Sequence, residues 1–197
     1  HEEALQHLHP RVDPAQPVTR AALQAIAAVV EKGPQHLLQR THLRRAPVDQ
    51  HVHVQRNAHL EVAVAKQHAH VAKKALEKGK RILLFSGGEL TVTIKNEAGS
   101  GGPNQEYLLA LAIELQGENG ICALACDTDG IDGNKDVAGA FIDETTLTRA
   151  KALALDSLHL LNNNQSHEFF NTLGDLIITG PTHTNVNDFR VIMVSPD

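Results

Sequence analysis

The spacing of apolar residues predicts a succession of helices and strands from residue 57 onward. Residues 57–78 carry apolar side chains at intervals of three and four, which is the period of one helix face, and Gly79 supplies a stop. Residues 82–85 form a short apolar run typical of a buried strand. The Ser-Gly-Gly that follows, at 86–88, is typical of a turn. Residues 90–94 alternate apolar with β-branched polar residues, which favours a second strand with one face in water.

The same kind of pattern continues to residue 194. A glycine-rich loop at 99–103 precedes a predicted helix that contains Leu108 to Leu115 and takes Asn104 as its N-cap. Strands are predicted at 120–126, 138–142, 176–179 and 191–194, and helices at 144–155 and 165–173. This alternation predicts an α/β fold with a mixed sheet and flanking helices.

Residues 1–56 differ in character from the rest. They are rich in histidine, glutamine and arginine, and only residues 19–30 show a short helical pattern. Their histidine pairs lack the carboxylate and cysteine partners of a typical zinc site, so a solvated segment is the simpler interpretation. We therefore divide the chain into a partly helical N-terminal segment, 1–56, and an α/β domain, 57–197.

Composition narrows the possible partners and compartment. Hydrophobic residues make up 42% of the chain, enough for a buried core. The formal net charge of −5 argues against binding to nucleic acid or to an anionic membrane, because both attract basic proteins. No apolar run approaches the length of a membrane span and no signal peptide is visible, so a cytoplasmic protein is expected. Cys122 and Cys126 lie in an apolar run, which favours buried thiols over a disulfide.

Three polar segments follow predicted strands, at 86–89, 127–133 and 179–188. Ligands of α/β sheets collect outside the carboxyl ends of strands, so these segments are the first candidates for a site. In the first, Glu89 is a candidate general base or binding group, with a plain turn residue as the alternative. Asp188, in the third, is the other candidate base.

The acidic segment Asp127-Thr128-Asp129-Gly130-Ile131-Asp132-Gly133 has two interpretations. Asp127 and Asp129 are candidate ligands of Mg²⁺ carried in with a nucleotide, because that ion keeps waters and uses phosphate oxygens. Alternatively, the acids and glycines form tight Asx turns. The spacing does not match an EF-hand.

Two further segments offer groups for a polar ligand. In the loop 179–188, Thr182, Thr184 and Asn185 are candidate substrate contacts, and the alternative is a loop bonded to itself. Gly101, Gly102 and Asn104 precede or begin a helix, where free backbone N–H groups favour an anion. This loop has neither the Walker A pattern nor a dinucleotide fingerprint.

Four motifs together resemble the MOFRL domain, the C-terminal part of class II glycerate kinases. In order, they are SGGELTVTI, GSGGPNQEYLLALAIEL, DTDGIDG-x-x-D-x-AGA and TGPTHTNVNDFRVIMV, and the resemblance covers residues 79–195. The resemblance implies an α/β domain that closes an active site together with a larger nucleotide-binding domain, which residues 1–56 do not supply. It also implies ATP, Mg²⁺ and D-glycerate, with phosphate transferred to the 2-hydroxyl.

The chain departs from the family at Pro103, where many relatives have Arg, and at Gln165 and His167, where relatives often have Asp and Tyr. Two other functions stay open. Many members carry the name hydroxypyruvate reductase, which would require NAD(P)H, and an isolated domain could bind a hydroxy acid without catalysis. A homodimer is compatible with all three hypotheses.

Overall fold

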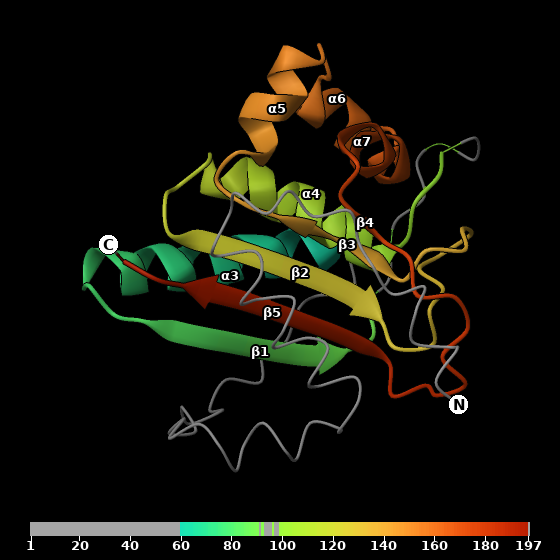
Figure 1. The fold of residues 1–197 in the computed structure, drawn as a ribbon. Helices are drawn as coiled ribbons and strands as arrows, with labels where there is room; N and C mark the ends of the chain where they lie inside the picture. The colour runs from blue at the N-terminus through green and yellow to red at the C-terminus, as the bar shows by residue number, and fades with distance from the viewer. Residues whose placement is uncertain (1–59, 91, 93–95, 97–98, 197) are drawn as a thin grey trace, which may run out of the picture. The chain divides into compact units, whose positions relative to one another are not determined.

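The computed structural model describes residues 60–90, 92, 96 and 99–196. They form a five-stranded sheet in the order β1-β5-β2-β3-β4, with helices packed against it (Figure 1). All four pairings are antiparallel. The strands are β1 Ile82–Gly88, β2 Ile121–Asp127, β3 Gly139–Ile142, β4 Leu176–Ile177 and β5 Asp188–Val194. The helices are α3 Leu60–Glu77, α4 Pro103–Leu115, α5 Thr146–Ala152, α6 Ser157–Asn162 and α7 Ser166–Leu173.

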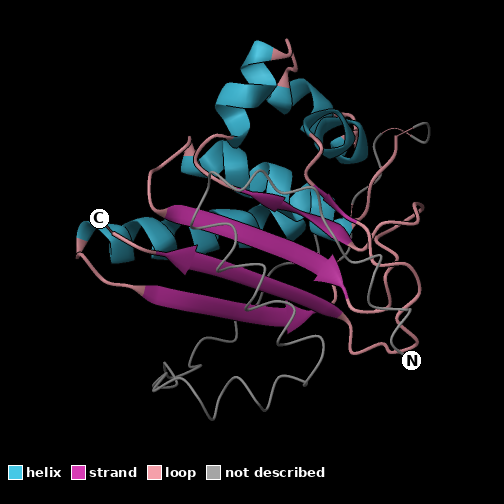
Figure 2. Cartoon of the chain, in the orientation of Figure 1, coloured by secondary structure: helices cyan, strands magenta, loops and turns pink. Residues whose placement is uncertain are grey.

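Helix α4 is the centre of the core. It contacts β2 and β3 on one side, α3 on another, and the short helices α5, α6 and α7, which Figure 2 shows grouped beyond it. Leu108, Leu109 and Leu111 are all fully buried, as expected of a helix that is surrounded by other elements rather than amphipathic. Helix α3 presents small alanines to this core, and their size lets α3 approach α4 closely.

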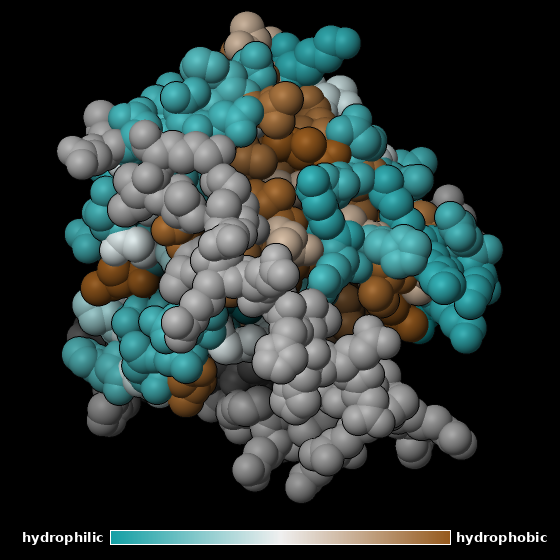
Figure 3. Space-filling view, turned by 180° about the vertical axis from the view of Figure 1, so that it is seen from behind, coloured by the Kyte–Doolittle hydropathy of each residue, from teal (hydrophilic) through white to brown (hydrophobic). Residues whose placement is uncertain are grey.

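Aliphatic residues and two phenylalanines fill the rest of the core. Phe169 and Phe170 of α7 are fully buried and meet edge to face, with ring centroids 5.1 Å apart. From the helix side, the described surface shows apolar residues in its central part and hydrophilic residues toward the rim (Figure 3). Among the described residues, no helix is long and apolar enough to cross a membrane.

The structure confirms the α/β class, the flanking helices and most of the predicted elements. The prediction of a mixed sheet is wrong, because all the strand pairs of the described residues are antiparallel, and several elements need correction at their ends. Residues 86–88 continue β1 rather than forming a turn, because the pairing with β5 runs on to Gly88 and Asp188. Leu90 and Val92 lie outside any strand, and the rest of the strand predicted at 90–94 lies outside the described residues, as does the helix predicted at 19–30.

Two helix predictions also need correction. The single helix predicted at 144–155 is the shorter α5, and a separate helix, α6, follows it. Asn104 is not the N-cap of α4, because the helix begins at Pro103 with Gly102 as the cap residue.

The prediction of buried thiols is confirmed. Cys122 and Cys126 of β2 are both free and buried. Burial raises the pKa of each thiol to about 12, so both stay protonated near neutral pH.

Candidate functional site

The antiparallel sheet brings the predicted polar segments to one end. Strands β1 and β2 both run opposite to β5, so their carboxyl ends meet its first residue: Gly88 and Asp127 each pair with Asp188. The loop 178–187 connects β4 to this same point on β5. Residues 86–90, 127–133 and 179–188 are called the strand-end site below.

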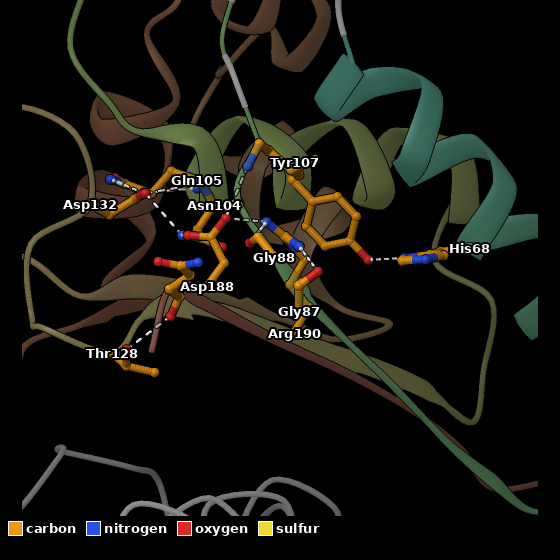
Figure 4. A network of polar contacts seen from close by, with 12 residues as sticks. His68, Gly87, Gly88, Asn104, Gln105, Tyr107, Thr128, Asp132, Asp188 and Arg190 are labelled. Carbon is orange, nitrogen blue, oxygen red and sulfur yellow. Dashed lines mark hydrogen bonds and ion pairs between the residues drawn. The ribbon is translucent and has the colours of Figure 1, made fainter. Parts of the chain in front are cut away.

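Asp188 and Arg190 form a buried ion pair at this site (Figure 4). Asp188 is 7% exposed and Arg190 is 2% exposed. The Asp188 carboxylate also accepts hydrogen bonds from the Asn104 side-chain amide, at 2.7 Å, and from the Leu90 backbone N–H, at 3.2 Å. Both of its oxygens are therefore engaged by groups of the protein itself.

The Arg190 guanidinium connects the ion pair to helices α3 and α4. It lies over the Tyr107 ring, 5.5 Å from the centroid, in a cation–π arrangement. The Tyr107 hydroxyl in turn lies 2.8 Å from Nδ1 of His68. Burial, together with the charge of Arg190, lowers the pKa of His68, so a neutral imidazole is favoured beside the tyrosine.

Asp132 occupies the N-terminus of α4. Its carboxylate accepts from the backbone N–H groups of Asn104 and Gln105, each at 3.0 Å, and from the side-chain amides of the same two residues, at 3.2 and 2.9 Å. Burial raises the pKa of Asp132, and the four hydrogen bonds oppose this effect. The Asp132 side chain thus occupies the position at the start of α4 where the sequence predicted a bound anion.

The glycines of the preceding loop allow this close packing. A Cβ on Gly102 would lie 2.4 Å from the carboxyl carbon of Asp132, and one on Gly101 would lie 2.2 Å from the hydroxyl of Ser166. An external anion at Gly101, Gly102 and Asn104 would have to compete with Asp132. Their role in ligand binding stays a prediction under that constraint.

Asp127 and Asp129 form the Asx turns that the sequence offered as an alternative to metal binding. Asp127 accepts from the N–H of Asp129 at 3.0 Å, and Asp129 accepts from the N–H of Ile131 at 2.9 Å. Within the described residues, no group of three or more His, Cys, Asp and Glu side chains could hold a metal ion. These turns do not exclude a role as ligands, because an Asx bond uses only part of a carboxylate's acceptor capacity.

The donor set at this turn fits a loosely held Mg²⁺ rather than a closed protein cage. Burial raises the pKa of Asp127, and the neighbouring carboxylates of Asp129 and Asp188 add to the effect, so a cation would relieve mutual repulsion. Mg²⁺ commonly binds through one or two carboxylates and completes its shell with water and phosphate. Asp127 and Asp129 would be the two carboxylates.

The loop after β4 is bonded mainly to the acidic segment. The Thr182 hydroxyl donates to the carbonyl of Thr128, and the Asn185 amide donates to Asp129 at 3.1 Å. The Thr128 hydroxyl bridges the backbone of residues 186 and 187. Thr182 and Asn185 therefore hold two loops together, whereas Thr184 is exposed beside them.

Helix α4 carries a further buried carboxyl beside Asp132 and Asp188. Glu106 of α4 is 2% exposed and accepts a hydrogen bond from the hydroxyl of Ser166, at 3.0 Å. Burial raises the pKa of Glu106 to about 7; the Ser166 bond opposes this shift, and the charges of Glu61 and Asp132 reinforce it. Folding therefore favours the protonated form of this side chain.

Glu106→Gln is expected to remove a pH dependence of stability. The folded state keeps the Glu106 proton up to a pKa of about 7, while the unfolded state loses it near the ordinary glutamate pKa of 4.5. Stability should therefore fall as pH rises between these values, by up to about 3 kcal/mol. Urea denaturation at pH 4.5 and pH 8 measures this difference, with exposed Glu118→Gln as the control. Equal pH dependence in wild type and Glu106→Gln would contradict the assignment.

The residues that support the site are not evident from the sequence. Arg190, Tyr107 and His68 were not predicted to take part, and Asp132 was considered only as part of a metal-or-turn cluster. One signal was present: Asp188 and Arg190 lie on the same buried face of β5 as Ile192 and Val194, at a spacing of two residues. A charged pair at that period indicates a buried ion pair.

Comparison with known proteins identifies a family and several relatives. The chain matches the MOFRL family over residues 82–188. It is 42% identical over 115 residues to a protein named D-glycerate 2-kinase from Thermotoga maritima, covering 58% of this chain and 27% of that protein. It is 44% identical over 122 residues to a protein named "Putative hydroxypyruvate reductase" from Agrobacterium vitis, covering 61% and 28%.

A solved structure shares the fold. The crystal structure of glycerate kinase from Thermotoga maritima superposes with a TM-score of 0.65 at 37% identity, covering 68% of this chain and 33% of that one. The chain thus spans between a quarter and a third of the length of these relatives. More than half of its residues lie within the family match, and the chain belongs to the MOFRL family.

Proposed function

We propose that this chain is the C-terminal part of a glycerate 2-kinase, which transfers the γ-phosphate of ATP to the 2-hydroxyl of D-glycerate. The observation that carries the proposal is the convergence of three polar segments at the strand-end site. The names of the Thermotoga maritima relatives support the same activity. A larger nucleotide-binding domain, of the kind implied by the greater length of the relatives, would complete the enzyme.

The site offers what phosphoryl transfer requires, which is mainly positioning and neutralisation of charge. Asp127 and Asp129 would hold Mg²⁺, which when bound neutralises charge on the phosphates. Thr182 and Asn185 fix the loop that presents Thr184 toward the substrate. Of the two carboxylates proposed as catalytic, Glu89 is exposed, while both oxygens of Asp188 are engaged.

The test is turnover by the longer protein that contains this domain. With ATP, Mg²⁺ and D-glycerate we expect 2-phosphoglycerate, detected by ³¹P NMR, and no oxidation of NADH when hydroxypyruvate is supplied. A well-folded protein that makes no 2-phosphoglycerate would refute the proposal, and NADH oxidation would favour the reductase.

Asp127→Asn should raise the Mg²⁺ concentration needed for half-maximal rate. Changes in residues that only support a metal ligand alter affinity by roughly 10–100-fold, and loss of a ligand charge should do at least as much. The exposed Glu118→Gln is the matched control. An unchanged Mg²⁺ dependence in Asp127→Asn would remove Asp127 from the metal site.

Calorimetry on the chain alone addresses the remaining alternative, a binding module. Binding of D-glycerate by the chain, combined with a longer protein that is inactive, would favour the module. Binding by the chain and turnover by the longer protein would place substrate contacts in this domain.

A further inference from the structure

We propose that the buried Asp188–Arg190 pair positions Glu89, and that Glu89 accepts a hydrogen bond from a hydroxyl of the hydroxy-acid substrate. This inference rests on the proposed function for the identity of the ligand. The positioning of Glu89 by the other two residues is argued from the structure alone, so it can be tested without knowing the substrate.

The two peptide groups that flank Glu89 are both bound by the ion pair. The carbonyl of Gly88, which precedes Glu89, accepts from Nη2 of Arg190 at 3.4 Å. The N–H of Leu90, which follows Glu89, donates to Oδ2 of Asp188 at 3.2 Å. Fixing both peptide groups restricts the two backbone dihedrals of Glu89, and therefore the direction of its side chain.

The backbone leaves β1 at this point. Gly88 has a φ of +96°, in the region that disfavours other residues, and its carbonyl and that of Gly87 both face the Arg190 guanidinium (Figure 4). The next residue, Glu89, is exposed, while Leu90 is 8% exposed. The chain thus presents one exposed carboxylate between two anchored neighbours.

The anchor is itself rigid. Arg190 is 2% exposed and packed on the ring of Tyr107, which is fully buried and bonded to His68. Asp188 is held on its other oxygen by Asn104, whose amide is also bonded to Asp132. The backbone at Glu89 is therefore already ordered before a ligand binds, which lowers the entropy cost of forming the contact.

A double-mutant cycle in the longer protein tests the proposal. Glu89→Gln should lower kcat/KM for D-glycerate by about 10–100-fold, as expected for losing a hydrogen bond to a charged group. Arg190→Lys keeps the charge but loses the planar fork, and should lower kcat/KM by a similar factor. Because both changes act through one carboxylate, the double variant should be about as slow as either single variant.

Several results would overturn the proposal. The first is a double variant whose loss of kcat/KM equals the product of the two single losses. The second is a kcat/KM of Glu89→Gln within about threefold of wild type. The third is an unchanged kcat/KM in Arg190→Lys. Glu118→Gln serves as the control for loss of an exposed carboxylate. If Arg190→Lys does not fold, Asp188→Asn takes its place in the cycle, since it keeps the side-chain volume and one acceptor oxygen.

Two measurements on the chain itself separate this inference from the proposed function. Tyr107 is the only tyrosine and there is no tryptophan, so intrinsic fluorescence reports whether the packing beneath Arg190 survives in each variant. Amide exchange at Leu90 should be slow in wild type and at least tenfold faster in Arg190→Lys. Unchanged exchange in Arg190→Lys would refute the positioning role even if the kinase assay succeeds. Faster exchange in a protein without kinase activity would refute only the assignment of the hydroxy acid as substrate.

Discussion

Replacing Asp188 with alanine should destabilise the chain by about 3–5 kcal/mol. The change leaves the Arg190 guanidinium, 2% exposed, without its counter-charge, and removing one partner of a buried pair typically costs that much. It also removes the acceptor of the Leu90 N–H and of the Asn104 amide. Urea denaturation at pH 7 measures the loss.

Two further variants make this first prediction specific. Glu114→Ala removes an exposed ion pair with Lys66 and should cost less than about 1 kcal/mol. Asp188→Ala combined with Arg190→Met should recover part of the loss, because no charge is then left buried. If Asp188→Ala costs no more than Glu114→Ala, the ion pair does not hold the strand ends together.

Asp132→Ala should have the second large effect, a loss of about 3–5 kcal/mol. The side chain is 1% exposed and accepts four hydrogen bonds at the start of α4. Loss of a helix cap alone costs about 1 kcal/mol. Each buried donor left without an acceptor adds about 1–3 kcal/mol, and this cost is reduced where the structure relaxes to give the donor a new partner. Thermal denaturation followed by circular dichroism gives the difference.

The conservative Asp132→Asn variant shows what the carboxylate contributes. It keeps the volume but turns an NH₂ group toward donors that need an acceptor, so an intermediate loss is expected. Adding phosphate should partly restore Asp132→Ala, since the N–H groups of Asn104 and Gln105 would then be free to bind an anion. Full stability of Asp132→Ala without any anion would contradict the capping role.

Local patterns in the sequence predicted most of the secondary structure. Strand β2 and helix α7 appear within one residue of the predicted positions, because an unbroken apolar run and a helical period are local signals. The end of β1 was missed because Ser-Gly-Gly usually marks a turn. Here the glycine backbone instead passes close to β5, where a Cβ on Gly87 would lie 3.2 Å from the carbonyl of Asp188.

The site was predicted as a location but not as a network. The polar segments that follow predicted strands do meet at one end of the sheet, because chain direction fixes which end each segment reaches. Nothing local could show that Asp132 reaches the start of α4, 28 positions away from Asn104, or that Arg190 lies over Tyr107. Such contacts depend on how the elements pack.

If D-glycerate and ATP–Mg²⁺ meet at the strand-end site, hydrogen–deuterium exchange of the longer protein should detect both ligands there. With both ligands bound, amide exchange should slow in residues 86–90, 127–133 and 179–188 and stay unchanged in α5 and α6. Slower exchange confined to α5 and α6, or none in the three segments at saturating ligand, would contradict it.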